Sequence, residues 1–156
     1  MKINSEQEMI TLGEELAAMC SANHKDLARA ARSVSEGHAA ANSSPNVIEL
    51  IGDVGAGKTT LVRGLAKGLG IKENITSPSF TISKSYAGKS KNLVHYDFYR
   101  LNDPGIIAED LAENIKNPNN IVVIEWSDTV KNLLPENRMI INIKYNDDDT
   151  REVEIS

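Results

Sequence analysis

Eight consecutive residues in this chain have the types and spacing of a phosphate-binding loop. Gly52 to Thr59 read Gly-Asp-Val-Gly-Ala-Gly-Lys-Thr, which matches the pattern G-x-x-x-x-G-K-T. An apolar run at residues 47–51 precedes the loop, and a helical pattern at residues 60–69 follows it. A strand, a tight turn and a helix in that order bring backbone N–H groups and the positive end of a helix dipole to one anion. The sequence therefore predicts a nucleotide-binding site, and a glycine-rich turn without a ligand is the weaker alternative.

The residue types within this loop each have a chemical role. The small residues at positions 55–57 let the backbone curl around a β-phosphate. Lys58 supplies a positive charge for the β- and γ-phosphates, and the hydroxyl of Thr59 can bind the Mg²⁺ that bridges them. Thr60 is expected near the α-phosphate. The residues predicted to contact the nucleotide are Asp53, Val54, Gly55, Ala56, Gly57, Lys58, Thr59, Thr60 and Trp126.

A first candidate acid lies on a predicted strand at residues 92–99. The strand period of two puts an apolar set on one face and His95 and Asp97 on the other. The apolar set is Val94, Tyr96 and Phe98. A sheet presents a base or a metal ligand to a site in this way, so Asp97 is a candidate for catalysis. An ordinary solvated strand face is the alternative.

A second candidate acid, Glu125, ends a continuous apolar run at residues 121–124. Such a run is typical of a strand that is buried on both faces. P-loop enzymes hold Mg²⁺ or orient the attacking water with an acid in this place, so Glu125 competes with Asp97 for these roles. A surface glutamate at a strand end is the alternative. Trp126, which follows, either stacks on an adenine or fills the edge of the sheet.

The remaining patterns predict the elements that position these residues. A capping box at Ser5 and Glu8 starts an amphipathic helix that extends to about residue 19. The other predicted elements are a hairpin of strands 81–86 and 92–99, helices 103–116 and 127–134, and strands 139–145 and 151–155. We predict one α/β domain over residues 1–156, of the P-loop NTPase type, with a mixed sheet whose parallel core strands are flanked by helices and antiparallel hairpins. Residues 22–46 are rich in Ala, Ser and Asn and are predicted to be an insertion or linker.

Composition limits the classes of function. A chain of 156 residues fits one domain with one nucleotide site. The net charge of −5 argues against a protein that binds nucleic acid over a broad surface by itself. The single cysteine, Cys20, lies in an apolar helical pattern and is expected to be buried or half-buried rather than redox-active. No apolar stretch is long enough to span a bilayer, so we expect a cytoplasmic protein with no membrane partner, monomeric when isolated.

The motifs favour ATP over GTP and hydrolysis over transfer to a metabolite. A GTPase is expected to have D-x-x-G and N-K-x-D strings, and the sequence contains neither. A small-molecule kinase needs clustered cations for an anionic second substrate, whereas the arginines after Lys58 are scattered along the chain. Of these arginines, Arg100 is the best placed to contact a phosphate or a partner.

Four motifs together resemble one known family. Residues 52–60 look like its G-D-L-G-A-G-K-T-T loop, and residues 77–80 look like its S-P-T-[FY]. Residues 95–100 match its H-x-D-x-Y-R, and residues 125–126 match its E-W. This is the TsaE (YjeE) family, the P-loop ATPase of bacterial threonylcarbamoyladenosine modification of tRNA. The match extends from about residue 47 to the C-terminal hairpin.

The resemblance implies a weak ATPase that functions when it docks on the TsaB–TsaD pair, so that tRNA is reached only indirectly. It implies ATP and Mg²⁺ as cofactors, with Mg²⁺ held by Thr59 and Glu125, and with Asp97 essential for hydrolysis. The predicted catalytic residues are Asp97, Glu125 and Lys58. The predicted switch and partner residues are Ser77, Pro78, Ser79, Phe80, His95, Tyr99 and Arg100.

The chain also departs from the family pattern. Residues 22–46 look like an insertion, Met9 replaces the usual Thr of T-x-x-L-G, and Ser79 replaces the Thr of S-P-T. Two other functions stay open beside the tRNA-modification ATPase. One is a nucleotide-dependent regulatory or binding module whose output is docking, and the other is a small-molecule kinase.

Overall fold

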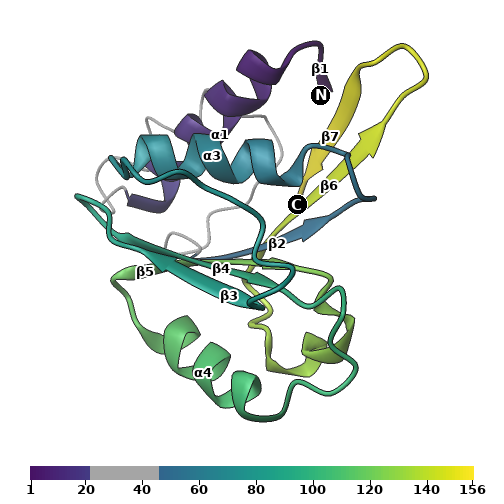
Figure 1. Cartoon of the computed structure of the whole chain (residues 1–156). Helices are drawn as coiled ribbons and strands as arrows, with labels where there is room; N and C mark the ends of the chain where they lie inside the picture. The colour runs from purple at the N-terminus through teal and green to yellow at the C-terminus, as the bar shows by residue number, and fades with distance from the viewer. Residues whose placement is uncertain (22–45) are drawn as a thin grey trace.

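A seven-stranded mixed sheet runs through the centre of the protein, with helices on both faces (Figure 1). The structure is a computed structural model, and it describes residues 1–21 and 46–156. The strands are β1 (Lys2–Ile3), β2 (Val47–Ile51), β3 (Ser83–Tyr86), β4 (Asn92–Asp97), β5 (Asn120–Glu125), β6 (Met139–Tyr145) and β7 (Arg151–Ile155). The helices are α1 (Glu6–Ser21), α3 (Lys58–Gly68) and α4 (Gly105–Lys116), and two 3₁₀ turns are η1 (Ser127–Thr129) and η2 (Lys131–Leu133).

The strand order confirms the predicted fold class. The order across the sheet is β1-β7-β6-β2-β5-β4-β3. The central strands β6, β2, β5 and β4 are parallel to one another, and the pairs β6–β7, β1–β7 and β3–β4 are antiparallel. The carboxyl ends of β2, β4 and β5 therefore meet at one edge of the sheet, where ligands of open α/β sheets bind.

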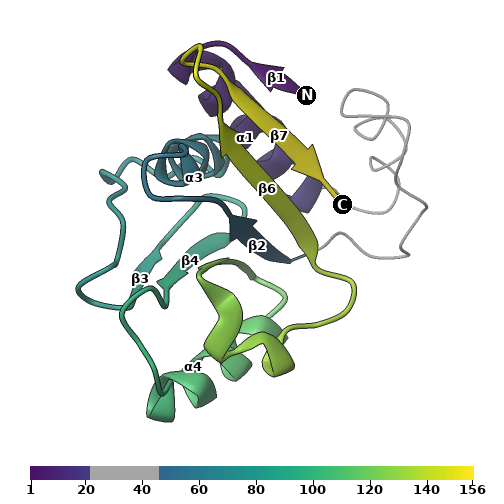
Figure 2. The same cartoon turned by 90° about the vertical axis from the view of Figure 1, so that its right-hand side faces the viewer.

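The sheet separates two apolar cores. Helices α1 and α3 cover one face and α4 covers the other, as Figure 1 shows. Strand β5 is buried throughout because Ile121 and Val123 enter the first core while Val122 and Ile124 enter the second. This arrangement is the reason for its unbroken apolar sequence. Figure 2 shows the hairpin of β6 and β7 beside α1, where residues of both strands join the first core.

Helices α1 and α3 approach each other closely because glycines form the contact. A Cβ atom on Gly64 would lie 2.2 Å from the carbonyl oxygen of Ile10, and one on Gly13 would lie 2.4 Å from the carbonyl oxygen of Leu61. No side chain fits at either position without moving a helix backbone. The close contact fixes the separation of α1 and α3, and thus the position of α3 beside α1 on this face of the sheet.

Gly64→Ala is expected to lower the free energy of unfolding by about 2–3 kcal/mol, the cost of overpacking a tight contact. In an open helix the same change would stabilise the protein by about 1 kcal/mol. Urea unfolding of both proteins measures the difference. Ala18→Gly, at an exposed position of α1, is the control for ordinary helix propensity. A Gly64→Ala protein at least as stable as the wild type would contradict the close backbone contact.

The start of α1 follows the predicted capping box in part. The Oγ of Ser5 accepts a hydrogen bond of 3.1 Å from the backbone N–H of Glu8. The Glu8 carboxylate accepts one of 2.8 Å from the N–H of Asn4, one residue earlier than the pattern predicts. Near the other end of the helix, Cys20 is fully buried as predicted, and burial raises the pKa of its thiol to about 12.

The predicted helix at residues 127–134 is wrong. The chain forms the 3₁₀ turns η1 and η2 instead, and the backbone of Val130 between them has φ −123°. Only nine residues separate the end of β5 from Pro135, and Asp128, Thr129 and Val130 have low helix propensity. In a segment this short, tertiary packing rather than helix propensity determines the backbone conformation.

Several element boundaries also differ from the predictions. Strand β3 begins at Ser83, because Ile82 has φ 66° and cannot continue a strand, and β4 ends at Asp97. Helix α4 begins at Gly105 rather than at Asp103, whose carboxylate accepts a hydrogen bond of 3.0 Å from the N–H of Gly105. Strand β1 was not predicted, because two residues have no detectable periodicity. The segment 22–46, except Asn46, lies outside the described residues.

Candidate nucleotide-binding site

The predicted loop connects β2 to α3, which begins at Lys58. Gly55 and Gly57 have φ values of 85° and 112°, in the left-handed region that glycine adopts without strain. The N–H of Ala56 donates a 3.1 Å hydrogen bond to the carbonyl of Asp53, which closes the turn. No side chain in the described part of the chain caps the N-terminus of α3. The first N–H groups of this helix thus remain for an anion.

A hollow of about 370 Å³ opens beside the loop and gathers residues from all four motifs. Its lining residues are Val54, Gly55, Gly57, Lys58, Thr59, Thr60, Ser77, Ser79, Asp97, Tyr99, Glu125 and Trp126. Segments up to about seventy residues apart in sequence meet here because the carboxyl ends of parallel strands share one edge of the sheet. Of the other predicted site residues, Asp53, Ala56, Pro78, Phe80, His95 and Arg100 are not among these lining residues.

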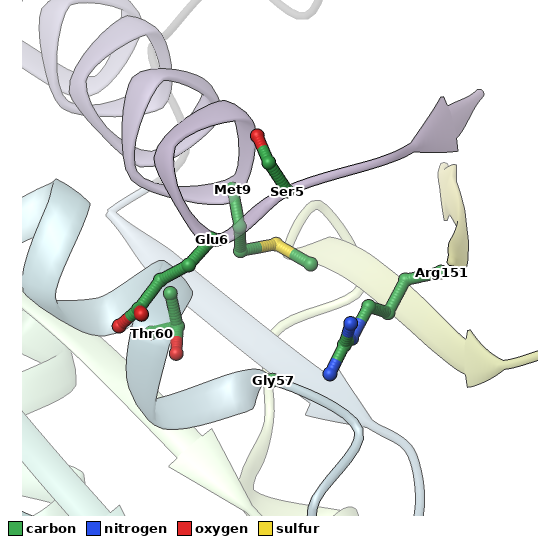
Figure 3. A pocket seen from close by; sticks show the side chains of 6 residues that line it. All are labelled: Ser5, Glu6, Met9, Gly57, Thr60 and Arg151. Atoms are coloured by element: carbon green, nitrogen blue, oxygen red, sulfur yellow. The ribbon is translucent and has the colours of Figure 1, made fainter. Parts of the chain in front are cut away.

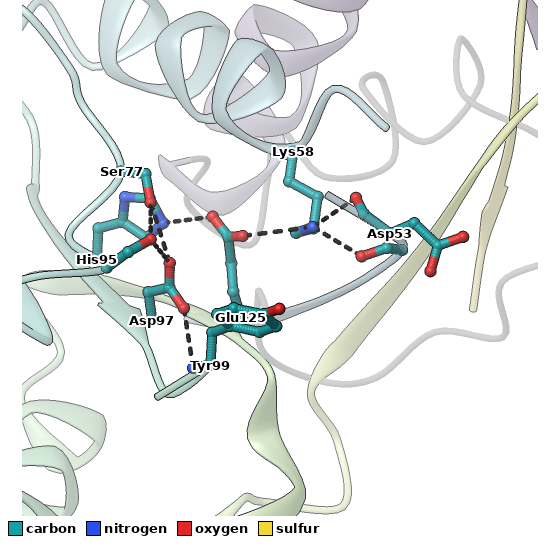
Figure 4. Close-up of polar contacts among 9 residues, drawn as sticks. Asp53, Lys58, Ser77, His95, Asp97, Tyr99 and Glu125 are labelled. Carbon is teal, nitrogen blue, oxygen red and sulfur yellow. Dashed lines mark hydrogen bonds and ion pairs between the residues drawn. The ribbon is translucent and has the colours of Figure 1, made fainter. Parts of the chain in front are cut away.

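The side chain of Lys58 lies on the loop itself (Figure 4). Its Nζ donates hydrogen bonds of 2.7 Å and 2.9 Å to the carbonyl oxygens of Gly52 and Asp53, and it lies 3.6 Å from Oε2 of Glu125. The lysine is only 6% exposed. Its charge is therefore already balanced by protein oxygens, and a phosphate must compete with them.

His95 holds the other oxygen of Glu125. The Nε2 of His95 lies 2.8 Å from Oε1 of Glu125, and both side chains are buried. Because an ionised carboxylate can only accept, Nε2 carries the proton in this pair. The ring's Nδ1 has no partner among the described residues. The alternative of a solvated strand face is thus wrong for His95, since the face that it occupies is buried.

Asp97 ties the segment 77–79 to the end of β4. Its Oδ2 accepts a 3.0 Å hydrogen bond from Ser77 and a second hydrogen bond from Ser79, while its Oδ1 accepts one of 3.0 Å from the N–H of Tyr99 (Figure 4). Asp97 is 4% exposed. A change in the charge or contacts of this one carboxylate would therefore be transmitted to the segment 77–79.

Trp126 covers the lysine end of the hollow. The Nζ of Lys58 lies 5.2 Å from the centroid of the indole ring, and the ring of Tyr99 lies 4.8 Å away at a tilt of 53°. Part of the indole also packs against the apolar core under α4. The sheet-edge interpretation of Trp126 is therefore supported by its contacts, while stacking on an adenine stays a prediction.

Phe80 and Arg100 form a pair outside the hollow. The guanidinium carbon of Arg100 lies 4.8 Å from the centroid of the Phe80 ring. Phe80 is 85% exposed, which is unusual for a large aromatic side chain. The predicted roles of both residues in binding a partner stay predictions.

A second, smaller hollow, drawn in Figure 3, was missed by sequence reasoning. It measures about 200 Å³ and is lined by Ser5, Glu6, Met9, Gly57, Thr60 and Arg151. Gly57 and Thr60 line both hollows. Arg151 comes from β7, and its sequence position carries no motif, so only the pairing of β7 with β6 and β1 reveals its place.

The donor atoms in the larger hollow fit the predicted Mg²⁺. Thr59, Asp97 and Glu125 offer hydroxyl and carboxylate oxygens, the ligands that this hard cation prefers. Within residues 1–21 and 46–156, no group of three or more His, Cys, Asp or Glu side chains forms a metal cage. Mg²⁺ is usually held by one or two carboxylates together with phosphate oxygens, so an all-protein cage is not required.

Comparison with known proteins identifies the family. The family model described as threonylcarbamoyl adenosine biosynthesis protein TsaE matches residues 3–153. The chain belongs to the TsaE family. The TsaE protein of Haemophilus influenzae is 39% identical over 109 residues, which cover 70% of this chain and 68% of the relative. That of Bacillus subtilis is 40% identical over 109 residues, or 69% of this chain and 67% of the relative.

A solved structure supports the same assignment. The crystal structure of Bacillus subtilis YdiB superposes with a TM-score of 0.69 at 29% identity, covering 98% of this chain and 80% of that one. The resemblance noted from the four motifs is thus confirmed. The TsaE relatives are named for tRNA threonylcarbamoyladenosine biosynthesis. Among residues 1–21 and 46–156, no helix combines the length and apolar composition that a membrane span requires.

Proposed function

We propose that this TsaE-family protein binds ATP with Mg²⁺ and hydrolyses it as the ATPase component of tRNA threonylcarbamoyladenosine modification, acting with TsaB and TsaD in the cytoplasm. The observation that carries the proposal is the convergence of Lys58, Thr59, Asp97 and Glu125 on one hollow beside the phosphate loop. P-loop enzymes require a lysine, a hydroxyl and an acid in this arrangement.

Binding of the triphosphate would transfer the Lys58 ammonium from protein oxygens to phosphate oxygens. The lysine would leave the carbonyls of Gly52 and Asp53 and turn toward the β- and γ-phosphates. The hydroxyl of Thr59 and the carboxylate of Glu125 would hold Mg²⁺. Bound there, Mg²⁺ neutralises charge on the phosphates during transfer.

The two carboxylates would then have different tasks. Glu125 keeps its orientation through His95 after Lys58 has moved away, because the 2.8 Å contact with Nε2 does not involve the lysine. Asp97 is bound by two serine hydroxyls and one backbone N–H, so it would orient the attacking water only with the segment 77–79 in place. Turnover would therefore depend on the position of that segment.

The exposed residues at the mouth of the hollow favour regulation by a protein partner. Val54 and Tyr99 line the hollow and are 76% and 53% exposed, and Phe80, which follows the lining residue Ser79, is 85% exposed. A partner that covers these side chains would exclude water from the site and fix the segment 77–79. The net charge of −5 supports contact with tRNA through partners rather than directly.

The arginines disfavour the kinase alternative. None of them lines the larger hollow among the described residues. Arg138 is paired with Glu49, Arg63 lies 3.5 Å from Glu6, and Arg100 stacks on Phe80. Within the described residues, an anionic second substrate would thus find no cluster of arginines at this hollow.

The test is the rate of ATP hydrolysis with Mg²⁺, measured for the protein alone and after addition of TsaB and TsaD from the same organism. We expect slow turnover alone and at least about tenfold stimulation in the mixture, since closing a site over its substrate commonly gates catalysis. A Lys58→Met protein in the same mixture controls for contaminating ATPase. Failure to bind the pair, with turnover that requires an added metabolite, would replace this proposal with the kinase.

A further inference from the structure

Trp126 holds a backbone conformation that a large side chain rarely adopts. Its φ and ψ are 56° and 52°, in the left-handed region. For a residue other than glycine this conformation costs free energy, and it persists only where the surroundings impose it. Trp126 stands directly after Glu125, so whatever fixes its backbone also affects the direction of that carboxylate.

The residue after Trp126 is anchored in the protein interior. Ser127 is 7% exposed, and its hydroxyl donates a hydrogen bond to Oε1 of Glu49. Glu49 is 3% exposed and lies in the middle of β2, opposite Ile124 of β5. The tether therefore joins the turn that follows β5 to the strand that leads into the phosphate loop.

A second residue completes the cluster. The Nε of Arg138, from the segment before β6, lies 2.5 Å from Oε2 of Glu49, and its Nη1 donates a 3.1 Å hydrogen bond to the carbonyl of Pro135. Each carboxylate oxygen of Glu49 thus has one donor. An apolar set of equal volume is commonly as stabilising as a buried ion pair, so stability alone does not explain a glutamate in this strand.

The position of the cluster suggests its role. Glu49 lies three residues before Gly52, and Ser127 lies two residues after Glu125. None of the three cluster residues lines either hollow. They connect the strand that leads into the loop with Lys58 to the turn that follows Glu125, without lining the hollow themselves.

We propose that Glu49, Ser127 and Arg138, the Glu49 cluster, are positioning residues that hold Trp126 in its left-handed conformation and so fix Glu125 against Lys58. The consequence for turnover rests on the proposed function. The consequence for Trp126 does not rest on the proposed function, because it concerns only the contacts of the indole with Lys58 and Tyr99.

The test uses Ser127→Ala, which removes the tether and leaves the ion pair of Glu49 and Arg138 intact. Trp126 is the only tryptophan in the chain, so tryptophan fluorescence reports on this residue alone. We expect emission at longer wavelength and stronger quenching by acrylamide. We also expect kcat for ATP, with TsaB and TsaD present, to fall about tenfold to a hundredfold with little change in KM, as a small displacement of a catalytic group can produce.

Two further variants separate positioning from folding. Thr129→Val removes a hydroxyl from the same turn, and the Oγ1 of Thr129 is buried without a hydrogen-bond partner in the described structure. It is expected to keep wild-type fluorescence and kcat. Ser127→Thr retains the hydroxyl and is expected to restore both. Thermal unfolding of each variant shows that the folded protein is being compared.

Unchanged fluorescence or unchanged kcat in Ser127→Ala, whatever the loss of stability, would overturn the proposal. Equal effects of Ser127→Ala and Thr129→Val would also overturn it, because the tether would then have no special role. A wild-type protein without ATPase activity would refute only the proposed function. In that case the fluorescence comparison would still decide whether the Glu49 cluster holds Trp126.

Discussion

Replacing Lys58 with methionine is expected to weaken ATP binding by about a hundredfold, because losing one hydrogen bond to a charged group costs about 2–3 kcal/mol. Methionine has a similar length but lacks the ammonium, which would contact the phosphates and which lies over the indole of Trp126. Titration calorimetry with ATP and Mg²⁺ measures the affinity. Thermal unfolding of the same samples shows whether Glu125, which retains His95, tolerates the loss of the lysine.

Lys67→Met is the matched control for this variant. Lys67 lies on the same helix, its side chain is 63% exposed, and it pairs with Glu14 at the surface. Exposed ion pairs contribute little, so the control is expected to bind ATP like the wild type. Wild-type affinity in Lys58→Met as well would refute the assignment of residues 52–59 as a phosphate-binding loop.

Glu125→Gln is expected to reduce ATP turnover by about a hundredfold or more while leaving ATP affinity within a few-fold, as loss of an acid that acts in the transition state does. Glutamine keeps the size of the side chain, and its carbonyl can accept the hydrogen bond from His95. The change therefore isolates the charge of the carboxylate. Single-turnover hydrolysis with TsaB and TsaD present separates the chemical step from binding.

Two further variants, a control and a variant of the second acid, are compared with Glu125→Gln. Glu154→Gln makes the same substitution at an exposed position of β7 and is expected to leave turnover unchanged. Asp97→Asn is expected to reduce turnover while ATP binding is retained, because its carboxylate holds Ser77 and Ser79. Turnover at the wild-type rate in both Glu125→Gln and Asp97→Asn would remove the two acids from catalysis.

Local patterns predicted the elements that are long and regular. The strands at residues 139–145 and 151–155 have the predicted bounds, because alternating apolar residues between turn residues define a strand without reference to the rest of the fold. The period of two also placed His95 and Asp97 opposite the apolar set of β4, and the apolar set enters the core under α4. The prediction of short elements failed, because the segments 2–3 and 127–134 contain too few residues to show a periodicity.

The sequence by itself determined the family, and it predicted the phosphate-binding loop and the two candidate acids, because each rests on a local string whose residue types have few other uses. Only the tertiary structure decided that Glu125 lies between Lys58 and His95, that Asp97 binds the segment 77–79, and that Glu49 anchors Ser127. These contacts join strands that are distant in sequence. They depend on the parallel order of β2, β5 and β4, which brings the carboxyl ends of the strands to one edge of the sheet.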